Sequence, residues 1–133
     1  MVCRVKRLPN TVKQKNIATG ARATAKTPKA SKYLEKDFTN YVIEFAHLHG
    51  WHVAHFPPIH TASGHWLTAV KADGKGWPDL VLVRGDRLII AELKTESQLS
   101  DEQIVWLSKF MGAGVTTYVW MPEDLDAIHK LLR

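Results

Sequence analysis

The sequence has little of what a secreted or membrane-embedded protein requires. It contains one cysteine, Cys3, in 133 residues, so no disulfide can form within the chain. No apolar run reaches the roughly 18 residues that a membrane-spanning helix needs. The N-terminus is basic but has no apolar segment of the kind found in secretory signals. These absences predict a cytoplasmic protein with no membrane partner.

Acidic residues are missing from the first part of the chain. Residues 1–30 carry eight lysines and arginines and no aspartate or glutamate, whereas the whole chain has a net charge of +5. This stretch also has few large apolar residues, so it cannot bury enough surface to offset the entropy of ordering. We expect a flexible basic segment at 1–30, followed by one folded domain at 31–133. The segment either is a solvated tail or neutralises the phosphates of a nucleic acid.

The folded part predicts an α/β protein with a small mixed central sheet flanked by helices. Apolar spacing favours a helix from Ser31 to a stop at Gly50, and the segment between 57 and 76 is expected to be a long hairpin loop or an irregular strand. The remaining apolar segments predict, in order, a strand at 51–56, two paired strands around 80–83 and 88–91, a helix from Ser100 to about 112, a strand at 115–121 and a helix at 122–132.

Two acids and a lysine lie at the ends of the paired strands. If Gly85 and Asp86 form a two-residue turn, Asp79 faces Glu92, and Lys94 lies on the same face as Glu92. Facing carboxylates repel each other, and a divalent cation such as Mg²⁺ would remove that repulsion. The alternative is an ordinary surface ion pair, in which Lys94 neutralises one carboxylate.

The context of these residues resembles the PD-(D/E)xK nuclease superfamily, and within it the VRR-NUC family. The matching segments are Gly76-Trp77-Pro78-Asp79-Leu80, Ala91-Glu92-Leu93-Lys94, Gln103, Glu35, Gly50-Trp51 and the sequence TYVWMPED at 117–124. The likeness covers residues 33–133 and is greatest to the short stand-alone members found in phages and bacteria. It implies a restriction-endonuclease-like fold and, for a phage-encoded chain, a location in the cytoplasm of the bacterial host.

The resemblance also implies a role for each matching residue. The implied ligands of a Mg²⁺ ion, which Mn²⁺ could replace, are Asp79, Glu92, the Leu93 carbonyl and Glu35. Lys94 would orient or activate the attacking water, and Gln103 would hold Lys94 or the substrate phosphate. Two of these residues have alternative interpretations. Gln103 forms a capping box with Ser100, and Glu35 is a first-turn acid favoured by the helix dipole.

The function implied by the resemblance is Mg²⁺-dependent hydrolysis of DNA, selective for branched structures such as four-way junctions or flaps. Symmetric cleavage of a junction needs two active sites, so we expect a homodimer formed through the first helix and residues 57–75. The alternatives are a nucleic-acid-binding module that cleaves nothing and a phage interaction protein that keeps only the fold.

Histidine and tryptophan are concentrated near the connection at 57–76. Six histidines fall within residues 47–65, which would suggest zinc, but the usual cysteine partners are absent from this region. We expect some of these histidines to contact phosphates instead. Trp66 and Trp77 are the tryptophans expected to stack on an unpaired base.

Overall fold

The computed structural model describes residues 28–96 and 98–133. The predicted basic segment at 1–30 lies outside the described residues, apart from its last three, which begin the first helix. The predicted α/β class is confirmed. Among the described helices, none has the length and apolar character needed to cross a membrane.

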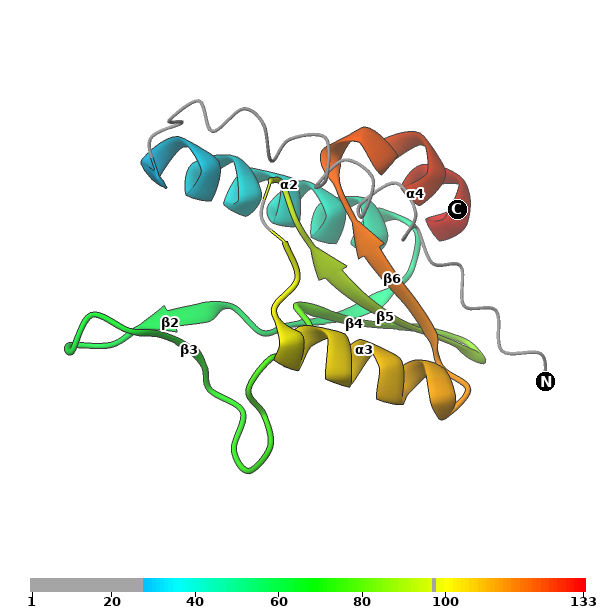
Figure 1. Ribbon diagram of the computed structural model, residues 1–133. Coiled ribbons are helices and arrows are strands. Elements are labelled where there is room, and N and C mark those ends of the chain that lie inside the picture. Colours follow the sequence, from blue (N-terminus) through cyan, green and yellow to red (C-terminus); the bar gives the residue numbers. More distant parts are fainter. Residues whose placement is uncertain (1–27, 97) are drawn as a thin grey trace.

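The order of elements follows the prediction, with one added hairpin (Figure 1). The helices are α2 (Pro28–Leu48), α3 (Asp101–Gly112), α4 (Leu125–Leu132) and the short 3₁₀ helix η1 (Pro122–Asp124). The strands are β1 (His52–His55), β2 (Pro58–His60), β3 (Trp66–Thr68), β4 (Leu80–Arg84), β5 (Arg87–Leu93) and β6 (Thr116–Trp120). The first helix begins at Pro28, before the predicted start at Ser31, because proline is well tolerated in the first helical turn.

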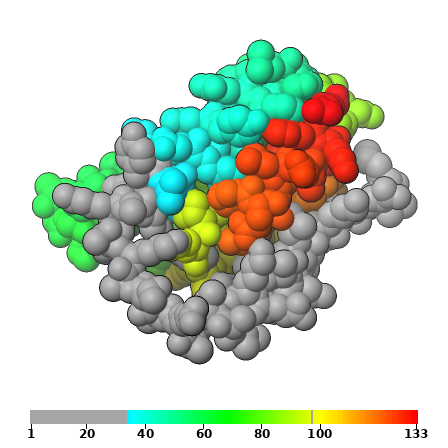
Figure 2. All heavy atoms as spheres, turned by 90° about the horizontal axis from the view of Figure 1, so that it is seen from above, coloured from blue at the N-terminus to red at the C-terminus, as the bar shows by residue number. Residues whose placement is uncertain are grey.

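The main sheet has four strands in the order β1-β4-β5-β6. The β1–β4 and β4–β5 pairs are antiparallel, whereas β5 and β6 are parallel and are joined through α3. Helices α2 and α4 cover one face of the sheet and α3 covers the other (Figure 1). Seen from above, α2 and α4 lie side by side (Figure 2). The sheet therefore lies between two helical layers.

The core lies between the sheet and the α2–α4 layer. Phe38, Val42 and Ala46 follow one another at a spacing of four residues, so they form one buried stripe along α2. The stripe packs on sheet and α4 residues that include Leu80, Leu82, Ile89, Ala91, Leu93, Trp120, Ile128 and Leu132. Each large apolar side chain buried in this way contributes about 1.5–3 kcal/mol.

The register of the central pair decides which side chains meet at its end. Leu80 pairs with Ala91 and Arg84 pairs with Arg87, so the predicted two-residue turn at positions 85 and 86 is confirmed. Gly85 has a φ of +59°, which a glycine adopts without strain. A slip of one residue would send every side chain to the opposite face of the sheet.

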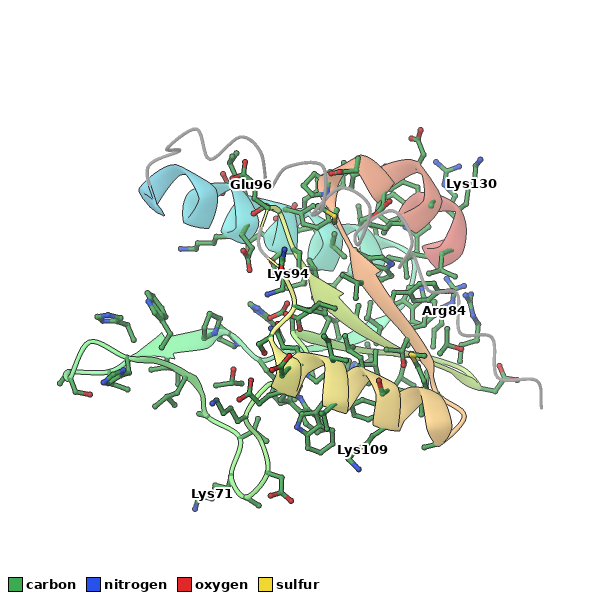
Figure 3. All side chains as sticks on the ribbon, in the orientation of Figure 1. Lys71, Arg84, Lys94, Glu96, Lys109 and Lys130 are labelled. Atoms are coloured by element: carbon green, nitrogen blue, oxygen red, sulfur yellow. The ribbon has the colours of Figure 1, made fainter. Side chains whose placement is uncertain are left out.

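The turn end of the sheet is held by one arginine. Arg84 Nη1 donates hydrogen bonds to the carbonyl oxygens of His49 and Leu132, both at 2.8 Å, and so ties the ends of α2 and α4 to β4. The guanidinium group also lies over the ring of Trp51, 4.6 Å from its centre. Figure 3 shows Arg84 near the C-terminal end of α4, at the opposite end of the sheet from Lys94.

Replacing Arg84 by methionine should lower the free energy of unfolding by about 2 kcal/mol, since hydrogen bonds from a charged donor to two helix-end carbonyls are lost. The methionine keeps much of the apolar stem over Trp51, so the change isolates the guanidinium group. Urea unfolding followed by circular dichroism measures the effect. Lys71→Met, at an exposed cation, should change stability by less than about 0.5 kcal/mol. Equal effects of the two substitutions would contradict this role of Arg84.

Candidate active site

Asp79 and Glu92 meet at the end of the β4–β5 pair, as the register predicted. The backbone N–H of Asp79 donates to Glu92 Oε2 at 3.2 Å, and the backbone N–H of Leu93 donates to Asp79 Oδ2 at 2.8 Å. Each carboxylate is therefore held by the backbone of the facing strand. Leu93 takes part through its N–H group, while its side chain is buried in the core.

Lys94 and Gln103 both lie next to the same oxygen of Glu92. Lys94 Nζ is 3.6 Å from Glu92 Oε1, and Gln103 Nε2 donates to that oxygen at 2.6 Å. Only 2% of Glu92 and 9% of Lys94 are exposed. The backbone N–H of Lys94 bonds to the carbonyl of Trp120 at 2.9 Å, which fastens the lysine to β6. This cluster is buried, so it is not an ordinary surface ion pair.

Gln103 forms the capping box that the sequence predicted and also contacts Glu92. Its side-chain Oε1 accepts a hydrogen bond from the backbone N–H of Ser100 at 2.9 Å. The backbone N–H of Gln103 donates to Ser100 Oγ at 3.2 Å, so the capping box is formed. Its Nε2 at the same time donates to Glu92, whereas the resemblance implied a contact with Lys94 or with the substrate phosphate, which stays a prediction. The N-terminus of α3 is thereby tied to the acidic pair.

Glu35 approaches the cluster from α2 but does not join it. It is half-buried and lies one turn before Phe38 and Thr39, on the face of α2 that packs toward the sheet. Burial raises its pKa, the nearby charge of Lys94 opposes that shift, and Asp79 adds to it. Within residues 28–96 and 98–133, no three histidine, cysteine, aspartate or glutamate side chains are grouped closely enough to hold a metal ion. The structure thus brings together two carboxylates, and Glu35 interacts electrostatically with Asp79 and Lys94 beside them.

If both were ionised, Asp79 and Glu92 would carry more negative charge than Lys94 neutralises. Burial is the main cause that raises the pKa of Glu92 well above its ordinary value, and the charge of Asp79 raises it further, whereas Lys94 opposes the shift. Burial also raises the pKa of Asp79. Two ionised carboxylates beside one ammonium group leave one negative charge without a partner, and such a charge is costly in a buried site.

These residues fit a divalent cation bound through oxygen atoms. Mg²⁺ is usually held by one or two protein carboxylates, with water and phosphate oxygens completing its shell. Asp79 and Glu92 supply such a pair, and their missing positive charge is what a cation would bring. The fit depends on this pair, because Glu35 does not form a three-residue metal group with it among the described residues.

The loop before Asp79 is pressed against the first turn of α3. Gly76 has a φ of +81°, and a Cβ atom there would lie 2.4 Å from the carbonyl carbon of Glu102. The ring of Trp77 packs edge-on against Trp106 and Phe110, with centroid distances of 4.9 and 5.5 Å. These contacts keep the start of β4 in place beside Gln103.

Trp77 was wrongly predicted to stack on a base. It is half-buried against α3 and belongs to an aromatic cluster with Phe56, Trp106 and Phe110. Its Nε1 atom is buried and has no hydrogen-bond partner within the part of the chain that the structure describes. The periodicity of the sequence could not reveal this packing, because Trp77 and α3 are distant along the chain.

His55 is a residue near the site that the motifs did not single out. It ends β1 opposite Leu80, and the backbone N–H of the next residue, Phe56, bonds to the carbonyl of Asp79 at 2.9 Å. Partial burial lowers the pKa of His55, and the charge of Asp79 opposes that shift. The pairing of β1 with β4 brings it there, and no motif of the sequence indicates that pairing.

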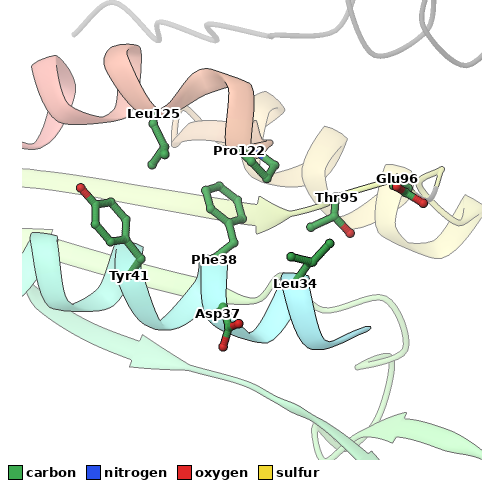
Figure 4. Close-up of a pocket in the computed structure, with 8 residues that line it drawn as sticks. All are labelled: Leu34, Asp37, Phe38, Tyr41, Thr95, Glu96, Pro122 and Leu125. Atoms are coloured by element: carbon green, nitrogen blue, oxygen red, sulfur yellow. The ribbon is translucent and has the colours of Figure 1, made fainter. Parts of the chain in front are cut away.

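A separate cavity of about 430 Å³ lies between α2 and the segment that contains η1 and the start of α4 (Figure 4). It is lined by Leu34, Asp37, Phe38, Tyr41, Thr95, Glu96, Pro122 and Leu125. The lining is mostly apolar, and Asp79, Glu92 and Lys94 take no part in it. It therefore does not belong to the acidic cluster.

No protein-family model, curated protein or solved structure matches this chain.

Glu92→Gln should weaken the pH dependence of stability in the metal-free protein. Because the pKa of Glu92 is raised from 4.5 in the folded state, the folded protein keeps a proton that the unfolded chain releases. The free energy of unfolding should therefore fall as pH rises from 4.5 through the raised pKa. Urea unfolding in EDTA across this range measures the slope.

Glu102→Gln is the matched control for that measurement. The pKa of Glu102 is lowered from 4.5 by its hydrogen bond with Lys75, so this glutamate titrates below the range tested. The control should keep the wild-type slope. A Glu92→Gln slope equal to that of the wild type would show that Glu92 is not held protonated.

Gly76→Ala should destabilise the protein more than Gly85→Ala. Both glycines have positive φ, so both substitutions carry a backbone cost of about 1–2 kcal/mol. At Gly85 the added Cβ meets nothing within 4 Å, whereas at Gly76 it meets the backbone of α3. That crowding should add about 1–3 kcal/mol. Thermal unfolding of the two variants gives the difference, and equal losses would show that the close approach costs nothing.

Proposed function

We propose that this protein is a metal-dependent endodeoxyribonuclease of the PD-(D/E)xK superfamily, related to the VRR-NUC family and restriction-endonuclease-like in fold. The observation that carries the proposal is that half-buried Asp79 and buried Glu92 meet at one end of the sheet, with buried Lys94 beside Glu92. Two facing acids with raised pKa values and one buried lysine form an arrangement that is unfavourable for stability alone. Strongly perturbed groups of this kind are typical of catalytic sites.

The reaction is hydrolysis of a phosphodiester. The oxygen of a water molecule forms a new bond to phosphorus, one ester P–O bond breaks, and the products are a phosphate monoester and a hydroxyl group. A divalent cation held by Asp79 and Glu92 would lower the pKa of the water and neutralise charge on the phosphate.

The residues around the acidic pair have distinct tasks in this proposal. Lys94 places a positive charge beside Glu92, where it can orient the attacking water and stabilise the negative charge that develops on phosphate oxygens. Gln103 holds Glu92 in position through its amide N–H and so acts as a positioning residue. Glu35 is half-buried and interacts electrostatically with Lys94 and Asp79. In this proposal it would act on the bound cation, either directly or through a water molecule.

Branched DNA is the proposed substrate class, on the basis of the likeness to the short stand-alone members of the family. The alternative of a fold that binds nucleic acid without cleavage is disfavoured, because it gives no reason to bury Glu92 and Lys94 in contact. Removal of such a pair in favour of apolar residues would often be neutral or stabilising.

Lys94→Met should reduce DNA cleavage by at least about 100-fold while leaving the fold intact, because charge stabilisation in a water-excluded site is worth several kcal/mol. The assay incubates labelled linear, flap and four-way junction DNA of matched sequence with the protein, in Mg²⁺, in Mn²⁺ and in EDTA. Cleavage should require a metal ion and should be fastest on a branched DNA. Circular dichroism checks that the variant is folded.

Lys109→Met is the control, since Lys109 is an exposed lysine in the last turn of α3. It should cleave at the wild-type rate. Cleavage by Lys94→Met at the wild-type rate would show that the site is assigned wrongly. Absence of cleavage of every DNA by the wild type, with either metal ion, would leave the non-catalytic alternative.

A further inference from the structure

The hairpin β2–β3 lies outside the body of the protein. It projects from the side of the sheet, well away from α2, α3 and α4 (Figure 1), and it stands out at one edge of the molecule in the view from above (Figure 2). All six of its strand residues are exposed or half-buried. A two-stranded hairpin with one short ladder is at best marginally stable in water, so this segment needs a reason to be presented in this way.

Both faces of the hairpin offer apolar surface to the solvent. Ile59 pairs with Leu67 on one face, and 47% and 46% of these residues are exposed. His60 pairs with Trp66 on the other face, where the two rings lie 4.6 Å apart. Trp66 is 51% exposed although it is the largest side chain of the hairpin.

The tip of the hairpin is ordered by its own hydrogen bonds. Thr61 Oγ1 donates to the carbonyl of His65 at 3.0 Å and accepts from the backbone N–H of the same residue at 3.1 Å. Thr61 and Ser63 hydroxyls are also within 3.0 Å of each other. These bonds hold the turn next to Trp66 in one conformation, which lowers the entropy cost of using the hairpin in binding.

The base of the hairpin is at the acidic cluster. The chain leaves the sheet after His55 and returns at Asp79, where the backbone N–H of Phe56 bonds to the Asp79 carbonyl at 2.9 Å. A ligand bound at Asp79 and Glu92 therefore lies at the point from which the hairpin projects.

The charge of this segment suits a polyanion. Residues 45–72 contain no aspartate or glutamate, although the acidic cluster begins only a few residues later at Asp79. A phosphate backbone that reaches the active site along the hairpin meets histidines, hydroxyl groups and Lys71 rather than carboxylates.

We propose that the hairpin β2–β3 is a DNA-binding arm in which Trp66 stacks on an unpaired base beside the phosphate to be cleaved. This inference rests on the proposed function and names what the enzyme selects, which is an unpaired base next to the site. Aromatic stacking accepts any base, so the selection is for structure rather than for sequence.

A second copy of the chain is the competing occupant, because Ile59, Trp66 and Leu67 were also predicted to lie in a dimer interface. The hairpin offers few apolar side chains, divided between two faces. A stable interface buries about 800 Å² on each partner, more than one face of a hairpin with three residue pairs supplies. DNA binding requires less apolar surface, because one stacked aromatic ring and a segment without acidic residues suffice. DNA therefore fits the hairpin better than a second copy of the chain does.

The test measures binding without cleavage. The full chain in EDTA is titrated into two fluorescein-labelled duplexes of the same sequence, one fully paired and one with a short unpaired bulge, and fluorescence anisotropy gives both affinities. The wild type should prefer the bulged duplex, and Trp66→Ala should lower that preference roughly tenfold. Trp66→Phe, which keeps an aromatic ring, should restore most of it. Leu88→Ala, at an exposed position 40% accessible at the far end of β5, should leave it unchanged.

The outcomes separate this inference from the proposed nuclease activity. If Trp66→Ala keeps the preference for the bulged duplex, or if the wild type has no such preference, the proposal that the hairpin binds DNA is wrong even if DNA is cleaved. A wild-type dimer that Trp66→Ala dissociates in sedimentation would also overturn it, in favour of an interface between copies. If no DNA is cleaved in Mg²⁺ but binding to the bulge still depends on Trp66, the arm stands and the nuclease proposal fails.

Discussion

The repulsion between Asp79 and Glu92 is the constraint around which this end of the protein is organised. Both carboxylates are brought into the interior at the end of a strand pair, where the loss of hydration disfavours their charged forms. Each is held by a backbone N–H of the opposite strand, so neither can turn away. The folded protein must therefore take up positive charge here, as a proton or as a cation.

Other elements pack so that this arrangement persists. Gln103 joins α3 to Glu92 while it also caps the helix, and Gly76 lets the preceding loop approach the same turn. Burial of the acidic cluster lowers the stability of the fold, and the apolar core beneath α2 and α4 offsets that cost. Arg84 ties the far end of β4 to the ends of both helices. The acidic cluster and the contacts of Arg84 thus lie at opposite ends of one strand pair.

The hairpin β2–β3 differs from the rest of the structure in that it contributes nothing to the core. It projects away from the sheet, with an ordered tip and an exposed tryptophan, and the chain before it contacts the backbone of Asp79 (Figure 1). A segment of this kind is better explained by what it contacts outside the chain than by packing. That explanation connects the shape of the proposed DNA substrate to a particular side chain.

The sequence by itself determined the features that depend on neighbouring residues. The two-residue turn at 85 and 86 sets the register, and the register brings Asp79 to Glu92, because the side-chain period of a strand is two. The capping box at Ser100 likewise follows from residues three positions apart.

Only the tertiary structure decided the features that depend on how distant elements cross. The amide of Gln103 reaches Glu92 because α3 lies against that end of the sheet, and Trp77 packs on α3 for the same reason. The half-buried position of Glu35 depends on where α2 packs on the sheet, and the approach of His55 to Asp79 depends on the pairing of β1 with β4. Sequence periodicity specifies which face of an element is apolar, but the position of one element on another is set by the packing of all of them together.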